Sequence, residues 1–208
     1  MADPRDRYTL RPPHSSDDWI AYHAIRRDAI FAPLLPRHAY DEHDPDEFKP
    51  GHLPHLLVRD GEIIGTVRID LIDPTQAGLR LIGIRNDLQR QGHGAILLQL
   101  AERAAHAFGR TMVVINAHPT SLTFYLANGY RTGDWHEGGP VPAGLIRVGK
   151  RLAKDLPRPL LPSRAAGEIQ PPRQKRNNAR RSGLLWSSRV ARCVLPFPSV
   201  DVARCSRA

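Results

Sequence analysis

The sequence has few of the residues that build disulfide frameworks, membrane spans or metal sites. It contains 2 cysteines in 208 residues, Cys193 and Cys205, both near the C-terminus, so disulfides cannot organise most of the chain. No apolar run is long enough to span a bilayer, and the N-terminus lacks the apolar segment of a signal peptide. The histidines and acidic residues show no spacing typical of metal ligands, and we expect no metal. We therefore expect a cytoplasmic protein without a membrane partner.

Acidic residues are scarce in only one part of the chain. Residues 1–155 contain 19 basic and 19 acidic residues, whereas residues 156–208 contain 11 basic and 2 acidic ones, which is the whole net charge of +9. The second part is also interrupted by prolines. We predict a single folded domain over residues 1–155 and a disordered, basic Pro/Arg-rich tail over residues 156–208. Because the domain is neutral, we expect no nucleic-acid binding other than through the tail.

The stretch that organises the domain runs from residue 79 to 109. An apolar run over 79–84 predicts a strand, and helical spacing of apolar residues over 95–108 predicts a helix that Gly109 caps. Between them lies the sequence Gln89-Arg90-Gln91-Gly92-His93-Gly94. The glycines allow close approach of the backbone, and a helix N-terminus offers unpaired N–H groups. We predict a phosphate-binding loop.

The other elements predict a mixed α+β fold. Asp60-Gly61 is a strong hairpin turn between two strands, Ser15-Ser16 offers a helix N-cap, and we expect a turn over residues 73–78. The predicted strands are 7–11, 55–59, 62–71, 79–84, 111–116, 130–136 and 145–152. The predicted helices are 16–31, 95–108, 120–128 and a short one within 37–48. This order indicates one sheet, with three consecutive antiparallel strands before the phosphate loop and helices on its faces.

A second motif follows the strand that ends at Asn116. Its sequence is Phe124-Tyr125-Leu126-Ala127-Asn128-Gly129-Tyr130, with Gly129 as the helix cap. Together with the Gln-x-x-Gly-x-Gly loop, it resembles the GNAT superfamily of N-acyltransferases, with Tyr130 in place of that family's phenylalanine. The resemblance is sharpest from Leu79 to Tyr130.

The resemblance implies both a fold and a reaction. The fold would be a mostly antiparallel mixed sheet, splayed where the cofactor binds, with helices on both faces. The reaction would be acetyl transfer from acetyl-CoA to a primary amine of a small molecule or protein, by direct attack in a ternary complex. The acceptor and the choice between monomer and homodimer stay open.

The resemblance also assigns the site. The Ile84 N–H would contact the thioester carbonyl, Asn116 the pantetheine arm, and Tyr125 would be the general acid; alternatively, Tyr125 only packs its helix onto the sheet. The residues expected to contact acetyl-CoA are Ile84, Gln89, Arg90, Gln91, Gly92, His93, Gly94, Ala95, Asn116 and Tyr125.

The general base is the weak point of the resemblance. Many relatives carry a glutamate on the strand before the loop, but residues 78–86 contain no carboxylate. Asp70, Glu62, His118 or a chain of waters could take this role. His118, on the loop after the Asn116 strand, has the best position of these, but a solvated or cap-forming histidine is the stronger interpretation of it. An acyl-CoA-binding module with little or no turnover is therefore the alternative hypothesis.

Overall fold

A computed structural model of the chain describes residues 7–34, 39–133, 135 and 141–153. The predicted tail, residues 156–208, lies outside the described residues. Within the described part, no helix combines the length and the apolar character that crossing a membrane requires.

The described strands form one seven-stranded sheet with the spatial order β1-β2-β3-β4-β5-β7-β6. Every neighbouring pair is antiparallel except β4–β5, which is parallel. The strands are β1 (Tyr8–Arg11), β2 (His52–Arg59), β3 (Glu62–Leu71), β4 (Gln76–Ile84), β5 (Met112–Ala117), β6 (Arg131–Thr132) and β7 (Ile146–Arg151). The predicted mixed α+β fold and its initial antiparallel strands are confirmed.

The helical elements include three α-helices and several short 3-10 or π segments. They are α1 (Ser16–Ile25), η2 (Arg26–Phe31), η3 (Ala32–Leu34), η4 (Pro45–Phe48), η5 (Asn86–Leu88), α2 (His93–Ala107), η6 (Pro119–Ser121) and α3 (Leu122–Ala127). Of the two serines predicted to offer a cap, Ser15 caps α1: its hydroxyl accepts the Asp18 N–H (3.1 Å), while the Asp18 carboxylate accepts the Ser15 N–H (3.3 Å). The predicted helix over residues 16–31 is one continuous helical stretch. Its geometry changes from α-helix to π-helix at Arg26.

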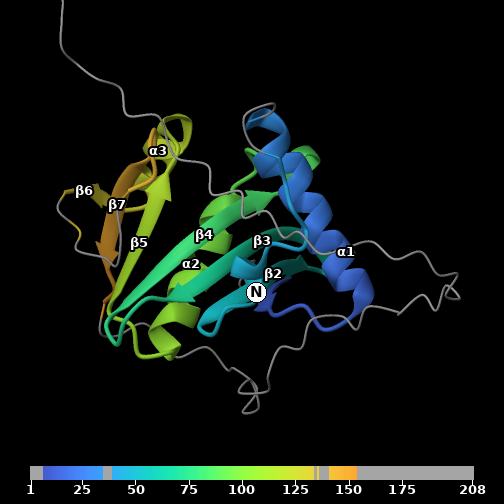
Figure 1. The fold of residues 1–208 in the computed structure, drawn as a ribbon, viewed down its shortest axis with the longest axis horizontal. Coiled ribbons are helices and arrows are strands. Elements are labelled where there is room, and N and C mark those ends of the chain that lie inside the picture. Colours follow the sequence, from blue (N-terminus) through green and yellow to red (C-terminus); the bar gives the residue numbers. More distant parts are fainter. Residues whose placement is uncertain (1–6, 35–38, 134, 136–140, 154–208) are drawn as a thin grey trace, which may run out of the picture. The chain divides into compact units, whose positions relative to one another are not determined.

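The helices α1 and α2 cover opposite faces of the sheet (Figure 1). Alternation along β2 explains the division, because successive strand side chains point to opposite faces. Leu56 packs in a cluster with Trp19 of α1, whereas Leu57 belongs to the larger core that contains Leu97 of α2. That larger core also holds Tyr125 of α3.

The start of β4 differs from the sequence prediction. The predicted turn extended to residue 78, but β4 begins at Gln76. The turn is tighter because the Asp73 carboxylate accepts the N–H groups of Thr75 (2.7 Å) and Gln76 (2.9 Å). Ala77 and Gly78 have weak strand propensity. They nevertheless belong to β4, because they are buried between β3 and β5 and pair with both strands, and these contacts outweigh the propensity.

The two central parallel strands separate after a short contact. Paired residues are Gln76–Met112, Ala77–Val113 and Gly78–Val114, and no pair follows. Figure 1 shows β4 and β5 adjacent at one end and diverging toward the other. A bulge bends β4 here: its register against β3 shifts between Thr66 and Arg68, and Leu81 has a φ of 51°. We call this unpaired region the β4–β5 gap.

Candidate functional site

Ile84 lies on the β4 side of the gap with its backbone directed into it. It is opposite Gly65 of β3, and the next bond runs from the Arg85 N–H to the Ile64 carbonyl (2.9 Å). Bonded and non-bonded pairs alternate along antiparallel strands, so Ile84 and Gly65 form a non-bonded pair. The N–H and C=O of Ile84 therefore point away from β3, toward β5.

Asn116 lies on the β5 side of the gap, beyond the last β4–β5 pair. The Leu152 N–H donates to the Thr111 carbonyl (2.8 Å), which makes that pair a bonded one. The same alternation makes Asn116 and Arg147 of β7 a non-bonded pair. The backbone of Asn116 thus points toward β4, while its side-chain carbonyl accepts the Arg147 Nε–H (3.2 Å). The structure places both predicted backbone contacts on facing sides of the gap.

The loop before α2 presents a row of backbone N–H groups. Arg90 and Gly92 have φ angles of 60° and 87°, and α2 begins directly after Gly92. The N–H groups of Ala95 and Ile96 donate to the Gly92 carbonyl (3.1 and 3.4 Å). Within the described residues, the N–H groups of residues 90–94 make no hydrogen bond. Together with the helix dipole, they form an anion-binding arrangement.

The two glycines of the loop have different structural reasons. At Gly92 a Cβ would meet nothing within 4 Å, but the positive φ favours glycine. At Gly94 a Cβ would lie 3.4 Å from the Phe124 ring, so this glycine allows α2 to approach α3. Our interpretation from sequence treated both as means of approaching an anion, which at Gly94 is incomplete.

Gln89 and Gln91, which we expected to contact acetyl-CoA, stabilise the loop through side-chain hydrogen bonds. The Gln89 side-chain amide donates to the Ile84 carbonyl and to the Asn86 Oδ1, both at 3.0 Å. The Gln91 amide donates to the Asp87 carbonyl (3.1 Å). Their side chains therefore fix the loop to the end of β4, and the Arg90 side chain between them is exposed.

His93 has a different environment from the one expected of a cofactor contact. Its side chain is buried (4% exposed), its Nδ1 lies 2.8 Å from the Tyr8 hydroxyl, and its Nε2 lies 3.5 Å from the Arg59 Nη1. Burial, and then the Arg59 charge, lower the pKa of His93. Within the described residues, the backbone N–H of His93 is the polar group of this residue that makes no contact. The sequence could not indicate Tyr8 and Arg59, because only the fold brings β1 and β2 to the start of α2.

Tyr125 lies on α3 with its ring buried (8% exposed). The ring contacts those of Phe124 and Tyr130 at centroid distances of 5.2 and 5.9 Å. Within the described part of the chain, its hydroxyl makes no hydrogen bond. Burial raises the pKa of Tyr125 to about 12. The phenol is therefore protonated at neutral pH and able to donate.

The three residues considered for the general base all have structural contacts. The Asp70 carboxylate accepts two hydrogen bonds from Arg68 (2.7 and 3.1 Å). Glu62 is exposed and pairs with Arg85 (2.5 Å). The Nδ1 of His118 lies 2.7 Å from the Thr120 hydroxyl, as an N-cap of η6. These contacts make none of the three a stronger candidate than it was from sequence.

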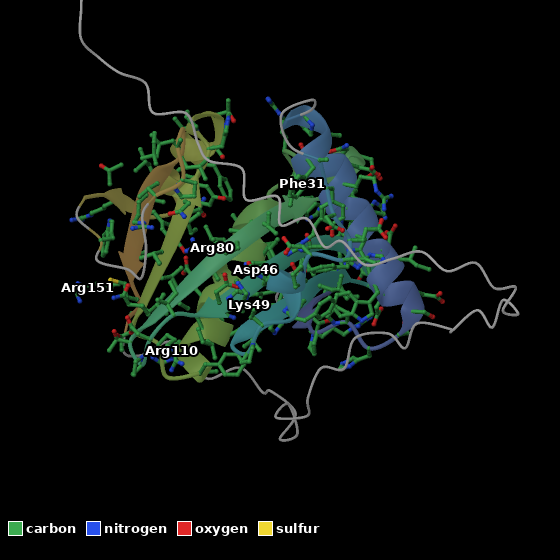
Figure 2. All side chains as sticks on the ribbon, in the orientation of Figure 1. Phe31, Asp46, Lys49, Arg80, Arg110 and Arg151 are labelled. Atoms are coloured by element: carbon green, nitrogen blue, oxygen red, sulfur yellow. The ribbon has the colours of Figure 1, made fainter. Side chains whose placement is uncertain are left out.

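A charged cluster lies near Asp70 on the face that α1 covers. Arg68 contacts Asp46 (2.8 Å) and Glu47 (3.2 Å), and Arg26 contacts Glu47 (2.5 Å). Figure 2 shows Asp46 and Arg80 on this same face. The cluster joins η4 and η2 to the middle of the sheet.

Glu102 of α2 is a buried charged residue that the sequence analysis did not single out. It is 4% exposed, accepts the Tyr130 hydroxyl (3.0 Å) and contacts Lys150 Nζ (2.8 Å). A signal was present, because Glu102 follows Leu98 by four residues and precedes Ala105 by three, which is the spacing of one helix face.

Comparison with known proteins identifies the family. The family model described as the acetyltransferase (GNAT) family matches residues 19–130, more than half of the chain. The chain belongs to the GNAT acetyltransferase family. Comparison with curated protein sequences gives no match.

Solved structures share the GNAT fold at low sequence identity. An acetyltransferase from Streptococcus agalactiae is 14% identical, with a TM-score of 0.56 over 70% of this chain and 99% of its own. A PaiA N-acetyltransferase from Thermoplasma acidophilum, in complex with coenzyme A, is 15% identical, with a TM-score of 0.55 over 69% and 98%. A GNAT acetyltransferase from Elizabethkingia anophelis, with acetyl-CoA bound, is 20% identical, with a TM-score of 0.51 over 71% and 99%.

Proposed function

We propose that the protein is an acetyl-CoA-dependent N-acetyltransferase that acts on a primary amine of a small molecule or protein. The observation that carries the proposal is the β4–β5 gap, into which Ile84 of β4 and Asn116 of β5 direct backbone groups that no neighbouring strand pairs. An extended amide chain can complete such an edge, as a peptide does when it adds to a sheet. The two solved relatives with coenzyme A or acetyl-CoA bound support the choice of co-substrate.

In this proposal the loop anchors the diphosphate of the co-substrate. The N–H groups of Gln91, Gly92, His93 and Gly94 meet the phosphates at the positive end of α2, and Arg90 adds a charge from the exposed side. The pantetheine arm then runs into the gap along Asn116. The Ile84 N–H donates to the thioester carbonyl and stabilises the negative charge that develops on its oxygen.

Tyr125 serves the leaving group. The amine nitrogen attacks the thioester carbon, the C–S bond breaks, and the sulfur leaves as a thiolate. The buried phenol stays protonated and donates a hydrogen bond to that sulfur, and the thiolate then takes a proton from solvent to give free CoA. The attacking amine loses its proton to solvent or to a base.

A binding module with little or no turnover is the second candidate. It is favoured by the absence of a carboxylate in residues 78–86 and by the structural contacts of Asp70, Glu62 and His118. Such a protein would use the same gap and loop to hold an acyl-CoA.

One experiment separates the two candidates. The protein is titrated with acetyl-CoA by calorimetry, and release of free thiol is then measured with a panel of primary amines. Binding with amine-dependent thiol release supports the transferase. Binding without release from any amine supports the binding module, and no binding rejects both.

A further inference from the structure

A cluster around a buried glutamate joins α2 and β7 to Tyr130, which follows α3. We call Glu102, Tyr130 and Lys150 the Glu102 cluster. The Glu102 carboxylate of α2 accepts the Tyr130 hydroxyl (3.0 Å) and contacts the Lys150 Nζ of β7 through both oxygens (3.0 and 2.8 Å). Burial, and then Glu102, raise the pKa of Tyr130, so its hydroxyl is a stable donor. A charge-assisted bond of this kind is stronger and better directed than a neutral one.

Tyr130 is tied directly to Tyr125. Its N–H donates to the Tyr125 carbonyl (3.1 Å), and the Gly129 N–H donates to the Leu126 carbonyl (3.0 Å). With Gly129 at a φ of 85°, these two bonds form a Schellman cap that ends α3. The two tyrosine rings also meet at 5.9 Å with an interplanar angle of 68°. A shift of the Tyr130 ring is therefore passed to Tyr125 through both backbone and side chain.

Phe124 of α3 and Tyr130, which follows α3, both contact the helix α2. Phe124 lies against Gly94 in the first turn of α2, and Tyr130 is bonded to Glu102 farther along it. The phosphate loop forms the start of that helix. Because α2 holds both, the distance between the bound diphosphate and the Tyr125 phenol depends on the Glu102 cluster.

We propose that Tyr130 and Glu102 are positioning residues that hold Tyr125 against the leaving sulfur during acetyl transfer. The proposal rests on the proposed function, since it needs Tyr125 to act on the thiolate. Small errors in the placement of a reacting group reduce rates strongly, whereas they change the affinity for the rest of the substrate little.

The test is a double-mutant cycle of Tyr125→Phe and Tyr130→Phe. The kcat and the KM for acetyl-CoA are measured by thiol release, with an amine that the panel identifies as acceptor. Tyr130→Phe keeps the ring and removes the hydroxyl, and we expect kcat to fall about tenfold with acetyl-CoA affinity unchanged within about twofold. In the Tyr125→Phe background, the same substitution should leave kcat unchanged.

The matched control is Tyr22→Phe. The Tyr22 hydroxyl also donates to a buried glutamate, Glu47, but on the opposite face of the sheet. The Tyr22→Phe substitution should lower the thermal midpoint about as much as Tyr130→Phe and leave kcat unchanged. Glu102→Gln is the second variant, which keeps the shape and one acceptor, and its loss of kcat should also vanish in the Tyr125→Phe background.

The outcomes separate this proposal from the proposed function. If Tyr130→Phe lowers kcat equally with and without the Tyr125 hydroxyl, or not at all, the positioning role is rejected while the transferase stands. If Tyr125→Phe leaves kcat unchanged, both the acid and its positioning residues are rejected. If the unmodified protein releases no thiol with any amine, the proposed function itself fails, and the positioning role with it.

Discussion

The two edges of β4 differ in how much of their backbone is satisfied. Toward β3, the strand is paired from Ala77 to Ile84, with one bulge. Toward β5, it is paired only over Gln76, Ala77 and Gly78. The same nine residues therefore form a closed edge on one side and an open edge on the other.

The difference shows how the fold makes a site out of a sheet. Buried backbone N–H and C=O groups without partners destabilise a protein, and open edges invite unwanted pairing. The bulge at Leu81 and the divergence of β5 nonetheless keep this edge open beside Ile84. A ligand with amide groups of its own can complete the sheet there, which the pantetheine arm of acetyl-CoA would do. The predictions below test the open edge and the closed edge in turn.

The largest effect is expected at the phenol that we place beside the open edge. Tyr125→Phe should lower kcat about 100-fold, the lower end of what a positioned acid contributes, and leave acetyl-CoA affinity unchanged. Burial raises the pKa of Tyr125 to about 12, so the phenol keeps its proton up to that range and loses it only above. The ratio of wild-type to Tyr125→Phe kcat should therefore stay constant from about pH 7 to about pH 10. A ratio that falls near pH 10 would indicate a phenol without its buried environment.

The next effect concerns the loop at the mouth of the open edge. Gly92→Val places a β-branched side chain at a φ of 87°, so the backbone must move and the row of N–H groups with it. We expect acetyl-CoA affinity to fall by about 2 kcal/mol, or roughly 30-fold, in a calorimetric titration. Gly109→Val is the matched control, because Gly109 has a φ of 82° and equally open space at the other end of α2. It should lower the thermal midpoint but not the affinity, and equal losses of affinity would contradict a local role for Gly92.

A substitution at the closed edge should change the free energy of unfolding more than the affinity for acetyl-CoA. A Cβ at Gly65 would lie 2.7 Å from the Ile84 Cδ1 and 2.9 Å from the Gly83 carbonyl oxygen, so β3 and β4 must separate to admit it. Gly65→Ala should destabilise the protein by about 1.5 kcal/mol in denaturant unfolding. Acetyl-CoA affinity should fall only a few-fold, through displacement of Ile84. Unchanged stability would show that the closed edge tolerates movement, and the contrast between the two edges would then weaken.

Local signals were sufficient for many of the elements around these edges. Asp60-Gly61 fixed the β2–β3 hairpin, and both residues have positive φ. Ser15 with Asp18 marked the start of α1, and Gly129 marked the end of α3 through its Schellman cap. Each of these signals depends on residues a few positions apart, which is why one sequence carries them. The splayed sheet came from the family resemblance rather than from any local pattern.

The errors lie where distant segments decide. The burial of Glu102 was missed because its partners, Tyr130 and Lys150, are 28 and 48 positions away. The burial of the His93 side chain was not foreseen either, because β1 and β2, which cover it, are distant in the sequence. The strand β4 starts three residues earlier than predicted because β5 pairs with Gln76, Ala77 and Gly78, and the last two are weak strand formers. Propensity cannot report burial that the rest of the chain supplies.

The smallest effect is expected at Gln89, which links the loop to the open edge. Its amide donates to the carbonyl of Ile84, the residue whose N–H we place on the thioester, and to Asn86. Gln89→Ala removes both bonds at a partly exposed place, so we expect acetyl-CoA affinity to fall by about 1 kcal/mol, roughly fivefold. Gln89→Glu should weaken binding further, because a carboxylate cannot donate to the Ile84 carbonyl and brings negative charge toward the phosphates. Gln99→Ala, an exposed glutamine of α2, is the control and should bind like the wild type. If Gln89→Glu bound as tightly as Gln89→Ala, the diphosphate would have to lie away from this end of the loop, and the anchor would then rest on the N–H groups nearer Gly94.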